Sequence, residues 1–455
     1  MTTQQPMFDQ IGEWAAQLTF EQIPERARRS VVHAVTDLLG VAVAGADHDL
    51  VPLLLDYVER SGSSGPCRLV GQGTTATMES AAAFNAAVAH VLDFDDTSDT
   101  LLGHPTVVIL PPLLAIADTR TVTGSELMTA YAAGLEAAAH IANQMNVAHY
   151  ERGWHPTATL GILGTATAAA KLLGLDAGGI TRALAIASAA PSGLRAHFGT
   201  HMKSVQVGEA ARKGLTAALL AAAGVEGNTA AFEDPQGYGV AYNGEDGFRQ
   251  EPFDASPSRT WDLVDPGLAL KQYPCCASAH PAVDAARALR AEVEGATIEG
   301  IRIRLHPRRL RHTDNPRPTT PLEGKFSVQY VVATALHTGS VVLQDFTQEA
   351  LTRPEVRHLM DRTVAEPFPP EEYGPDHFAG EVRLQLTNGR VLTRRVEKAR
   401  GRGTELALSD DEVADKFRAC VSPSLGPAAT EEVLSWITGL EAVDDVSKIM
   451  EALTS

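Results

Sequence analysis

Apolar residues recur every three or four positions through most of residues 8–270, and this spacing is typical of one face of an α-helix. The pattern is clear over 27–43 and in an Ala-rich run over 79–91. Thr123-Gly124-Ser125-Glu126 is a capping box, which predicts a long helix from there to about Ala142. Because many side chains on these faces are small, helices can approach closely, so we expect a helical bundle. Further helices are predicted over 157–173, 177–188 and 204–223.

The pattern changes near residues 254–265, after which alternating apolar and polar residues predict strands. Asn388-Gly389 lies between two such runs, and this pair is the strongest short signal for a β-hairpin. A capping box at Ser409 returns the chain to helix. The predicted strands are 298–305, 382–386 and 391–396, and the predicted helices are 281–294, 326–337, 411–420 and 428–438.

These segments predict a mainly α protein with a second, α+β domain. A chain of 455 residues exceeds what one hydrophobic core usually organises. We expect a large helical domain built from 1–265 and 406–455, and a smaller α+β domain, 266–405, between its two parts.

Composition excludes several kinds of partner. The formal charge of −18 argues against nucleic acid, although a local cluster of lysine and histidine could still bind an anion. No apolar stretch reaches the roughly 18 residues that a membrane span needs, and the first residues do not resemble a signal peptide. The four cysteines have no zinc-ligand spacing and suit a reduced cytoplasm, which is the expected location.

Four aspartates follow the predicted helix 79–91: Asp93, Asp95, Asp96 and Asp99. Carboxylates at a helix C-terminus oppose its dipole by roughly 0.3–1 kcal/mol each, so the cluster needs another reason. One interpretation is a solvated acidic turn between two helices. Another is the DDxxD pattern by which helical prenyl transferases hold magnesium diphosphate. No second acidic motif accompanies it and aromatic residues are only 5%, so no metal site is predicted.

A glycine-rich segment raises the question of a dinucleotide. Gly71-Gln72-Gly73 resembles the turn that binds a dinucleotide, but the segment that follows is one helix with no second strand. The βαβ context is therefore missing, and we expect no cofactor.

Three His-Pro pairs precede predicted helices: His104-Pro105, His155-Pro156 and His280-Pro281. Proline fits the first helical position and pushes the preceding residue out of helical geometry, so each histidine is expected at or near an N-cap. There the helix dipole lowers the pKa of an imidazole and keeps it neutral. The alternative for each is a purely local hydrogen bond. A fourth pair, His306-Pro307, follows a predicted strand and is interpreted as a loop.

Two lysines and one tyrosine complete the candidates. Lys203 stands just before the predicted helix 204–223, and Lys271 leads into His280, so both could clamp substrate carboxylates. The alternative for each is an ordinary surface lysine. Tyr150 lies five residues before His155 and could donate a proton, or it could simply pack with its hydroxyl satisfied.

Taken together, these segments resemble the MmgE/PrpD family, whose members include 2-methylcitrate dehydratases, cis-aconitate decarboxylases and iminodisuccinate epimerase. The resemblance covers about residues 10–420. The matching segments are Leu92-Asp93-Phe94-Asp95-Asp96-Thr97, Gly103-His104-Pro105, Gly153-Trp154-His155-Pro156-Thr157, Phe198-Gly199-Thr200-x-x-Lys203, Gly208-x-Ala210-Ala211-Arg212-x-Gly214, Lys271-x-Tyr273-Pro274-x-Cys276-x-x-x-His280, and Lys325-Phe326-Ser327 with Tyr330.

The resemblance implies a homodimer and a cofactor-free site in the cleft between the two domains, which binds a small anionic carboxylate. Cys276 departs from decarboxylases of the animal type, which carry histidine at that place, while the 150–157 segment is more similar to the epimerase-like branch. The implied site residues are Asp93, Thr97, His104, His155, Lys203 and Lys271, with Tyr150 and His280 added by similarity to that branch.

These chemistries all remove a proton beside a carboxylate or form an equivalent carbanion. Lys203, Lys271 and His104 would neutralise the substrate carboxylates. His155 would act as the base and Asp93 would orient a neighbouring imidazole or lysine, while Tyr150 or His280 would donate a proton. We expect a dehydratase of a citrate- or 2-methylcitrate-like acid. The alternatives are an epimerase of an iminodisuccinate-like dicarboxylate, a cis-aconitate-type decarboxylase and a non-catalytic carboxylate-binding protein.

Overall fold

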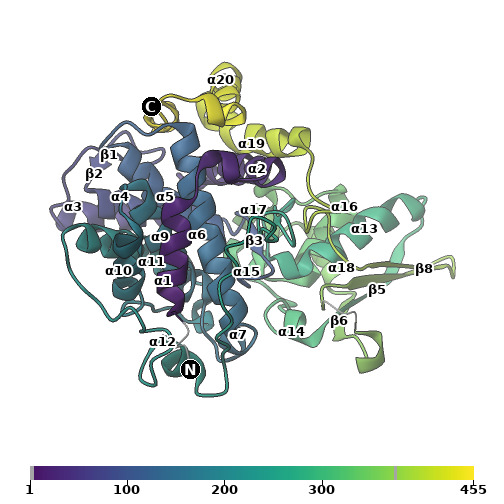
Figure 1. Ribbon diagram of the computed structural model, residues 1–455. Coiled ribbons are helices and arrows are strands. Elements are labelled where there is room, and N and C mark those ends of the chain that lie inside the picture. Colours follow the sequence, from purple (N-terminus) through teal and green to yellow (C-terminus); the bar gives the residue numbers. More distant parts are fainter. Residues whose placement is uncertain (1–4, 374–376, 455) are drawn as a thin grey trace. The chain divides into compact units, whose positions relative to one another are not determined.

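The chain forms two compact units in the computed structural model, which describes residues 5–373 and 377–454 (Figure 1). Unit 1 contains the described residues up to Leu270 and those from Ser409 onward. Unit 2 runs from Lys271 to Leu408. Unit 1 is almost wholly helical and unit 2 combines helices with a sheet, so the predicted fold class is confirmed.

Unit 1 is a helical bundle in which α11 packs against both α4 and α9, and α9 packs against α6. Every residue of α5 is buried, because this helix carries no charged side chain. The helices are α1 Met7–Gln17, α2 Glu25–Gly45, α3 Val51–Arg60, α4 Met78–His90, α5 Pro105–Ala117, α6 Gly124–Met145, α7 Ala148–Glu151, α8 Pro156–Thr159, α9 Gly161–Leu172, α10 Ala177–Ala187, α11 Met202–Ala222, α12 Tyr238–Asn243, α19 Asp410–Leu425, α20 Pro427–Thr438 and α21 Ser447–Thr454.

In the part of unit 1 that the structure describes, four two-residue strands interrupt the helices. They are β1 Cys67–Arg68, β2 Thr75–Ala76, β3 Thr97–Ser98 and β4 Leu268–Ala269. β1 pairs with β2, and β3 pairs with β4, both antiparallel. The β3–β4 pair ties the aspartate-rich turn to Leu268 and Ala269, at the end of the first segment of unit 1.

Helix α19, the first helix after unit 2, packs against α2. Lys416 Nζ lies 2.6 Å from Asp37 Oδ1 on α2 and donates to the Phe94 carbonyl at 2.7 Å. Helices α2 and α19, far apart in the sequence, therefore both contribute to the part of unit 1 that carries the aspartates.

The described residues of unit 2 form one four-stranded sheet in the order β6-β5-β7-β8. β5 is parallel to β6 and antiparallel to β7, and β7 and β8 form the hairpin predicted at Asn388-Gly389. Its strands are β5 Ile298–Leu305, β6 Thr363–Pro367, β7 Gly380–Leu386 and β8 Val391–Val396, and its helices are α13 His280–Glu292, α14 Pro307–Leu310, α15 Pro321–Lys325, α16 Val328–Thr338, α17 Gln348–Leu351 and α18 Pro354–Met360.

Two local predictions are wrong. The helix predicted over 157–173 is interrupted at Leu160, which separates α8 from α9. The His306-Pro307 pair was interpreted as loop, but it begins α14, because the His306 ring accepts a hydrogen bond from the Arg308 N–H and caps the turn. No described helix has both the length and the apolar composition needed to cross a membrane.

Candidate active site

The aspartate-rich turn is folded into the interior of unit 1. Asp93, Asp95 and Asp96 are all buried, at most 3% exposed. Asp93 adopts a left-handed backbone conformation (φ 52°), which reverses the chain directly after α4. A solvated acidic turn is therefore the wrong interpretation. The DDxxD interpretation does not fit either, because Asp95 bonds to histidine and Asp96 accepts a hydrogen bond from Thr106.

A chain of hydrogen bonds links this turn to α11. Lys203 Nζ donates to Asp93 Oδ1 at 2.7 Å and lies 2.7 Å from His90 Nε2. On the other side of the same ring, His90 Nδ1 lies 2.8 Å from Asp95 Oδ2. An ammonium group can only donate, so His90 accepts at Nε2 and its Nδ1–H donates to Asp95. Lys203 therefore contacts the Asp93 carboxylate directly and the Asp95 carboxylate through the His90 ring.

This contact depends on a close approach of α4 and α11. A Cβ at Gly208 would lie 2.4 Å from the Ala83 carbonyl oxygen of α4. Only glycine allows that spacing. His90 at the end of α4 and Lys203 at the start of α11 therefore reach hydrogen-bond distance.

His104 approaches both carboxylates from the start of α5, where it is the N-cap residue as predicted. Its Nδ1 lies 3.0 Å from Asp95 Oδ2, and its Nε2 lies 3.8 Å from Asp93 Oδ1. Burial by itself would raise the pKa of Asp95, but His104 and His90 hold that pKa well below its usual range. Asp95 is therefore an anion shared by two imidazoles.

His155 enters the same group from the start of α8. Its ring stacks on His90 with centroids 6.2 Å apart, and Phe198 packs edge-on at 5.0 Å. Its Nδ1 lies 2.5 Å from Gln206 Nε2. Its Nε2 is buried and has no hydrogen-bond partner among the described residues. A buried polar atom left in this way normally costs about 1–3 kcal/mol, so it points to a ligand.

The pKa of His155 is lowered well below its ordinary value, so the ring is neutral, as the sequence analysis predicted. The physical cause differs from the predicted one. Burial is the largest contribution, followed by the positive charge of Lys203 and then by His90 and His104. The dipole of α8 contributes little to the lowered pKa of His155, because that helix has only four residues.

We call His90, Asp93, Asp95, His104, His155 and Lys203 the imidazole–lysine cluster. Four of these residues were named as site candidates from the sequence, whereas His90 and the pairing of Asp95 with two imidazoles were missed. A signal for His90 exists, because it is the last residue of α4 and stands directly before the aspartates. Gln206 was also missed, although it follows Lys203 by three residues on one helix and so shares its face.

The other site residues suggested by the sequence lie as follows. Thr97 is in β3, with Oγ1 3.5 Å from the Ala269 carbonyl. Tyr150 is in α7, where the Arg195 guanidinium lies 3.6 Å from the centre of its ring and donates to its carbonyl oxygen at 2.8 Å. The described contacts of Tyr150 are thus with arginine rather than with the cluster.

Lys271 and His280 belong to unit 2, and both are buried. His280 is the first residue of α13, in line with the prediction that it lies at or near an N-cap. Its Nε2 lies 3.2 Å from the Cys275 carbonyl oxygen, and its ring contacts Tyr273 with centroids 5.1 Å apart.

Three side chains of the cluster are of the types that bind metal ions. One ligand atom each from His90, Asp95 and His104 lie within 4.8 Å of one another. However, a cation held by His90 would meet the Lys203 ammonium, which lies 2.7 Å from His90 Nε2. This arrangement therefore suits a hydrogen-bonded ionic network better than a divalent ion.

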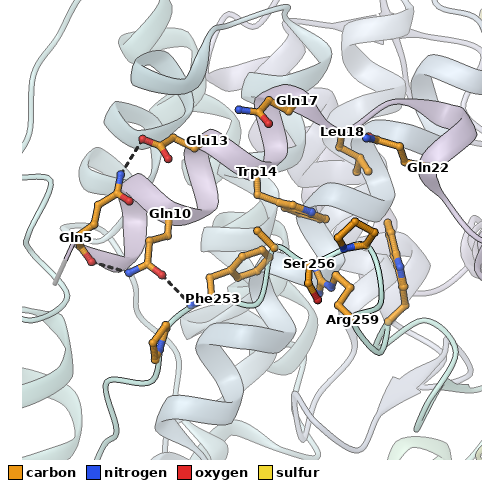
Figure 2. Close-up of a pocket in the computed structure, with 14 residues that line it drawn as sticks. Gln5, Gln10, Glu13, Trp14, Gln17, Leu18, Gln22, Phe253, Ser256 and Arg259 are labelled. Atoms are coloured by element: carbon orange, nitrogen blue, oxygen red, sulfur yellow. Dashed lines mark hydrogen bonds between the residues drawn. The ribbon is translucent and has the colours of Figure 1, made fainter.

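A hollow of about 570 Å³ lies along α1 and is lined by none of the cluster residues (Figure 2). Arg259 lies in its wall, with its guanidinium 4.7 Å from the Trp14 ring and 4.8 Å from that of Phe253. The same guanidinium donates to the buried Glu136 at 2.6 Å. Because its charge is already paired, this hollow is a weaker candidate than the cluster.

Comparison with known proteins identifies relatives of both units. The family model for the MmgE/PrpD N-terminal domain matches residues 9–251, and that for the MmgE/PrpD C-terminal domain matches residues 273–440.

Individual relatives match over nearly their full length. The human protein "Cis-aconitate decarboxylase" is 28% identical over 452 residues, which are 95% of this chain and 90% of that protein. The mouse protein of the same name is 28% identical over 445 residues, 95% of this chain and 89% of that protein. The Aspergillus terreus protein of that name is 27% identical over 474 residues, 98% of this chain and 95% of that protein.

Proposed function

The chain belongs to the MmgE/PrpD family, and from this premise we propose that it is a lyase that decarboxylates a small unsaturated tricarboxylate of the cis-aconitate type. The single observation that carries the proposal is the buried Lys203 ammonium beside a neutral His155 whose Nε2 has no partner within the described residues. The names of the aligned relatives favour decarboxylation over the dehydration expected from the sequence.

The chemistry requires stabilisation of negative charge. When the bond to the departing carboxylate breaks, its electron pair spreads over the neighbouring carbon atoms and carboxylate, and a proton must then reach carbon. Lys203 uses two of its three N–H groups on Asp93 and His90, which leaves one for the substrate. In a buried site such fixed donors stabilise a developing anion more strongly than water does. Lys203 is therefore the proposed proton donor, and solvent restores its proton after carbon dioxide leaves.

Elimination of water from a citrate- or 2-methylcitrate-like acid is the second candidate. The observation that favours it is Cys276, which stands where decarboxylases of the animal type are expected to carry histidine. Removal of a proton followed by loss of hydroxide passes through the same kind of carbanion, so the cluster serves both reactions.

A substrate panel followed by proton NMR in D2O separates these reactions. Cis-aconitate, citrate, 2-methylcitrate and iminodisuccinate are incubated with the protein. We expect cis-aconitate to lose carbon dioxide and to gain one deuterium on carbon. A new alkene from citrate or 2-methylcitrate would replace the proposal by dehydration, and inversion with deuterium uptake would replace it by epimerisation. Binding of these acids without any turnover would replace the proposal by a non-catalytic carboxylate-binding protein.

Lys203→Met is expected to lower kcat by roughly 100-fold or more, because it removes a charged donor to the developing anion. The matched control is Lys213→Met on the same helix, since Lys213 bonds to the Ala190 carbonyl and to Ser192 rather than to the cluster. Steady-state kinetics on the active substrate compares the two. Equal activities would reject Lys203 as a catalytic residue.

The homodimer and the cytoplasmic location expected from the sequence also belong to this proposal. Light scattering coupled to gel filtration tests the dimer, and a monomer at micromolar concentration would contradict it.

A further inference from the structure

We propose that Gln206 fixes the tautomer of His155, so that the imidazole presents Nε2–H to the substrate as a hydrogen-bond donor and does not act as the base. This inference rests on the proposed function, because it assigns a direction to one group of that site. It reverses the role that the sequence analysis gave to His155.

The orientation of the Gln206 amide is fixed by the backbone of Leu194. The Leu194 N–H donates to Gln206 Oε1 at 3.1 Å, and Gln206 Nε2 donates to the Leu194 carbonyl at 3.3 Å. Exchanging the amide oxygen and nitrogen would place two donors together and two acceptors together. The NH₂ group therefore faces His155 Nδ1, at a distance of 2.5 Å.

A ring nitrogen that accepts a hydrogen bond carries no proton. The single proton of the neutral His155 ring must then be on Nε2. A second proton, on Nδ1, would point at the amide N–H of Gln206, so this contact also disfavours the imidazolium form. Burial and the charge of Lys203 act in the same direction, since both lower the pKa of His155.

One short segment aligns both partners. The His155 N–H donates to the Gly193 carbonyl at 3.1 Å, and the Arg195 N–H donates to the Gly153 carbonyl at 2.9 Å. Leu194, which lies between these two contacts, pairs with Trp154 and also holds the Gln206 amide. The backbone of residues 193–195 therefore positions both the His155 residue and the Gln206 amide that donates to its Nδ1. Their relative geometry is set before a substrate binds.

The consequence is a division of labour within the cluster. A neutral imidazole is a poor acid but a good hydrogen-bond donor, and it can polarise a carboxylate or carbonyl oxygen without giving up its proton. His155 would therefore stabilise the anion, while Lys203 delivers the proton to carbon. Gln206 touches His155 and not the reacting atoms, so it is a positioning residue.

Nitrogen-15 NMR of the full chain labelled on histidine tests the tautomer directly, with His155→Asn used to assign the signals. We expect the wild type to show an unprotonated Nδ1 and a protonated Nε2 at His155 near neutral pH. A protonated Nδ1 in the wild type would overturn the inference. This readout needs no substrate, so it stands or fails separately from turnover of the substrate panel.

Two variants at Gln206 give a second readout. Gln206→Glu provides an acceptor, so we expect Nδ1 to become protonated, kcat to fall roughly 100-fold and a new ionisation to appear in the pH profile of kcat. Gln206→Leu removes the amide, and we expect a mixture of tautomers with a smaller loss in kcat and little change in KM. Wild-type tautomer and pH profile in both variants would contradict the assignment.

Gln144→Leu is the control for loss of a buried glutamine. Gln144 is 3% exposed and accepts from the Glu251 N–H on another part of unit 1. In Gln144→Leu we expect the tautomer of His155 and the pH profile of kcat to match the wild type, even if the variant is less stable. The same NMR change in Gln144→Leu would show that the effect is general destabilisation and would reject a specific role for Gln206.

Discussion

Two neighbouring carboxyl groups in the 93–96 turn have opposite ionisation because their surroundings differ. The pKa of Asp95 is held low by His104 and His90, in spite of burial. Burial raises the pKa of Asp96 to about 8, and a hydrogen bond from Thr106 only partly offsets it. Thr106 in turn lies 2.6 Å from the Tyr131 hydroxyl, so a neutral polar network supports the charged cluster. The sequence alone shows that Asp95 and Asp96 are neighbours, but it could not predict that one is ionised and the other is neutral.

Asp96→Asn is expected to flatten part of the pH dependence of stability. The folded state keeps its proton up to about pH 8, whereas the unfolded carboxyl loses it near its ordinary pKa of 3.8. Wild-type stability therefore falls as pH rises between these values, by up to about 1.4 kcal/mol per pH unit, and the amide variant lacks this loss. Urea unfolding at pH 5 and pH 8 measures the difference.

The variant should gain stability relative to wild type on going from pH 5 to pH 8. Asp56→Asn serves as the control, since Asp56 is exposed and pairs only with Arg60 in its described ion pairs. Parallel pH dependences for the wild type and Asp96→Asn would contradict the neutral state of Asp96.

At the scale of elements, periodicity predicted helices and strands well but did not predict which of them meet. The capping boxes at Thr123 and Ser409 and the hairpin at Asn388-Gly389 are all present. The partner of Gln206 could not be predicted, because Leu194 lies in an irregular segment without a periodic pattern. The break at Leu160 was missed for a related reason, since apolar spacing continues through it. Local chemistry thus identified elements, whereas tertiary contacts decided the details of the site.

The close contact of α4 with α11 predicts the effect of one methyl group. Gly208→Ala would place a Cβ 2.4 Å from the Ala83 carbonyl oxygen, so the helices must separate. We expect a loss of about 1–3 kcal/mol in unfolding free energy, in spite of the better helix propensity of alanine. We also expect kcat to fall, because the contact between Lys203 and His90 would lengthen. Urea unfolding and steady-state kinetics measure the two effects.

Gly178→Ala in α10 is the matched substitution, since its Cβ would meet only Arg182 Nη1 at 3.5 Å and Asp176 Oδ1 at 3.7 Å. It should keep wild-type activity and equal or greater stability. A Gly208→Ala protein as stable and active as Gly178→Ala would show that the helices do not need this spacing.

For the molecule as a whole, the returning C-terminal segment supports the turn that carries the cluster. Lys416 on α19 bonds to Asp37 on α2 and to the Phe94 carbonyl within the turn. Its ammonium also lies 3.8 Å from the centre of the Phe94 ring. The sequence predicted that the tail packs on the helical half, but the hydrogen bond to the turn came only from the structure.

Lys416→Met should destabilise the protein and impair the site together. Removing this cation, whose side chain is 8% exposed, breaks its ion pair with the buried Asp37, and loss of one partner of a buried pair typically costs about 3–5 kcal/mol. Release of the Phe94 carbonyl should also lower kcat on the active substrate. Lys448→Met is the control, because Lys448 is exposed, and it should change stability by less than about 0.5 kcal/mol. Thermal unfolding and steady-state kinetics compare the two variants. Equal stability and equal kcat in both would contradict a supporting role of Lys416 for the turn.

A crystal structure with tricarballylate tests the central claim most directly, because this saturated tricarboxylate has no double bond to activate decarboxylation. We predict one carboxylate within hydrogen-bond distance of both Lys203 Nζ and His155 Nε2. Binding at another place, with Lys203 and His155 making no contact to the ligand, would contradict the claim that the imidazole–lysine cluster is the active site.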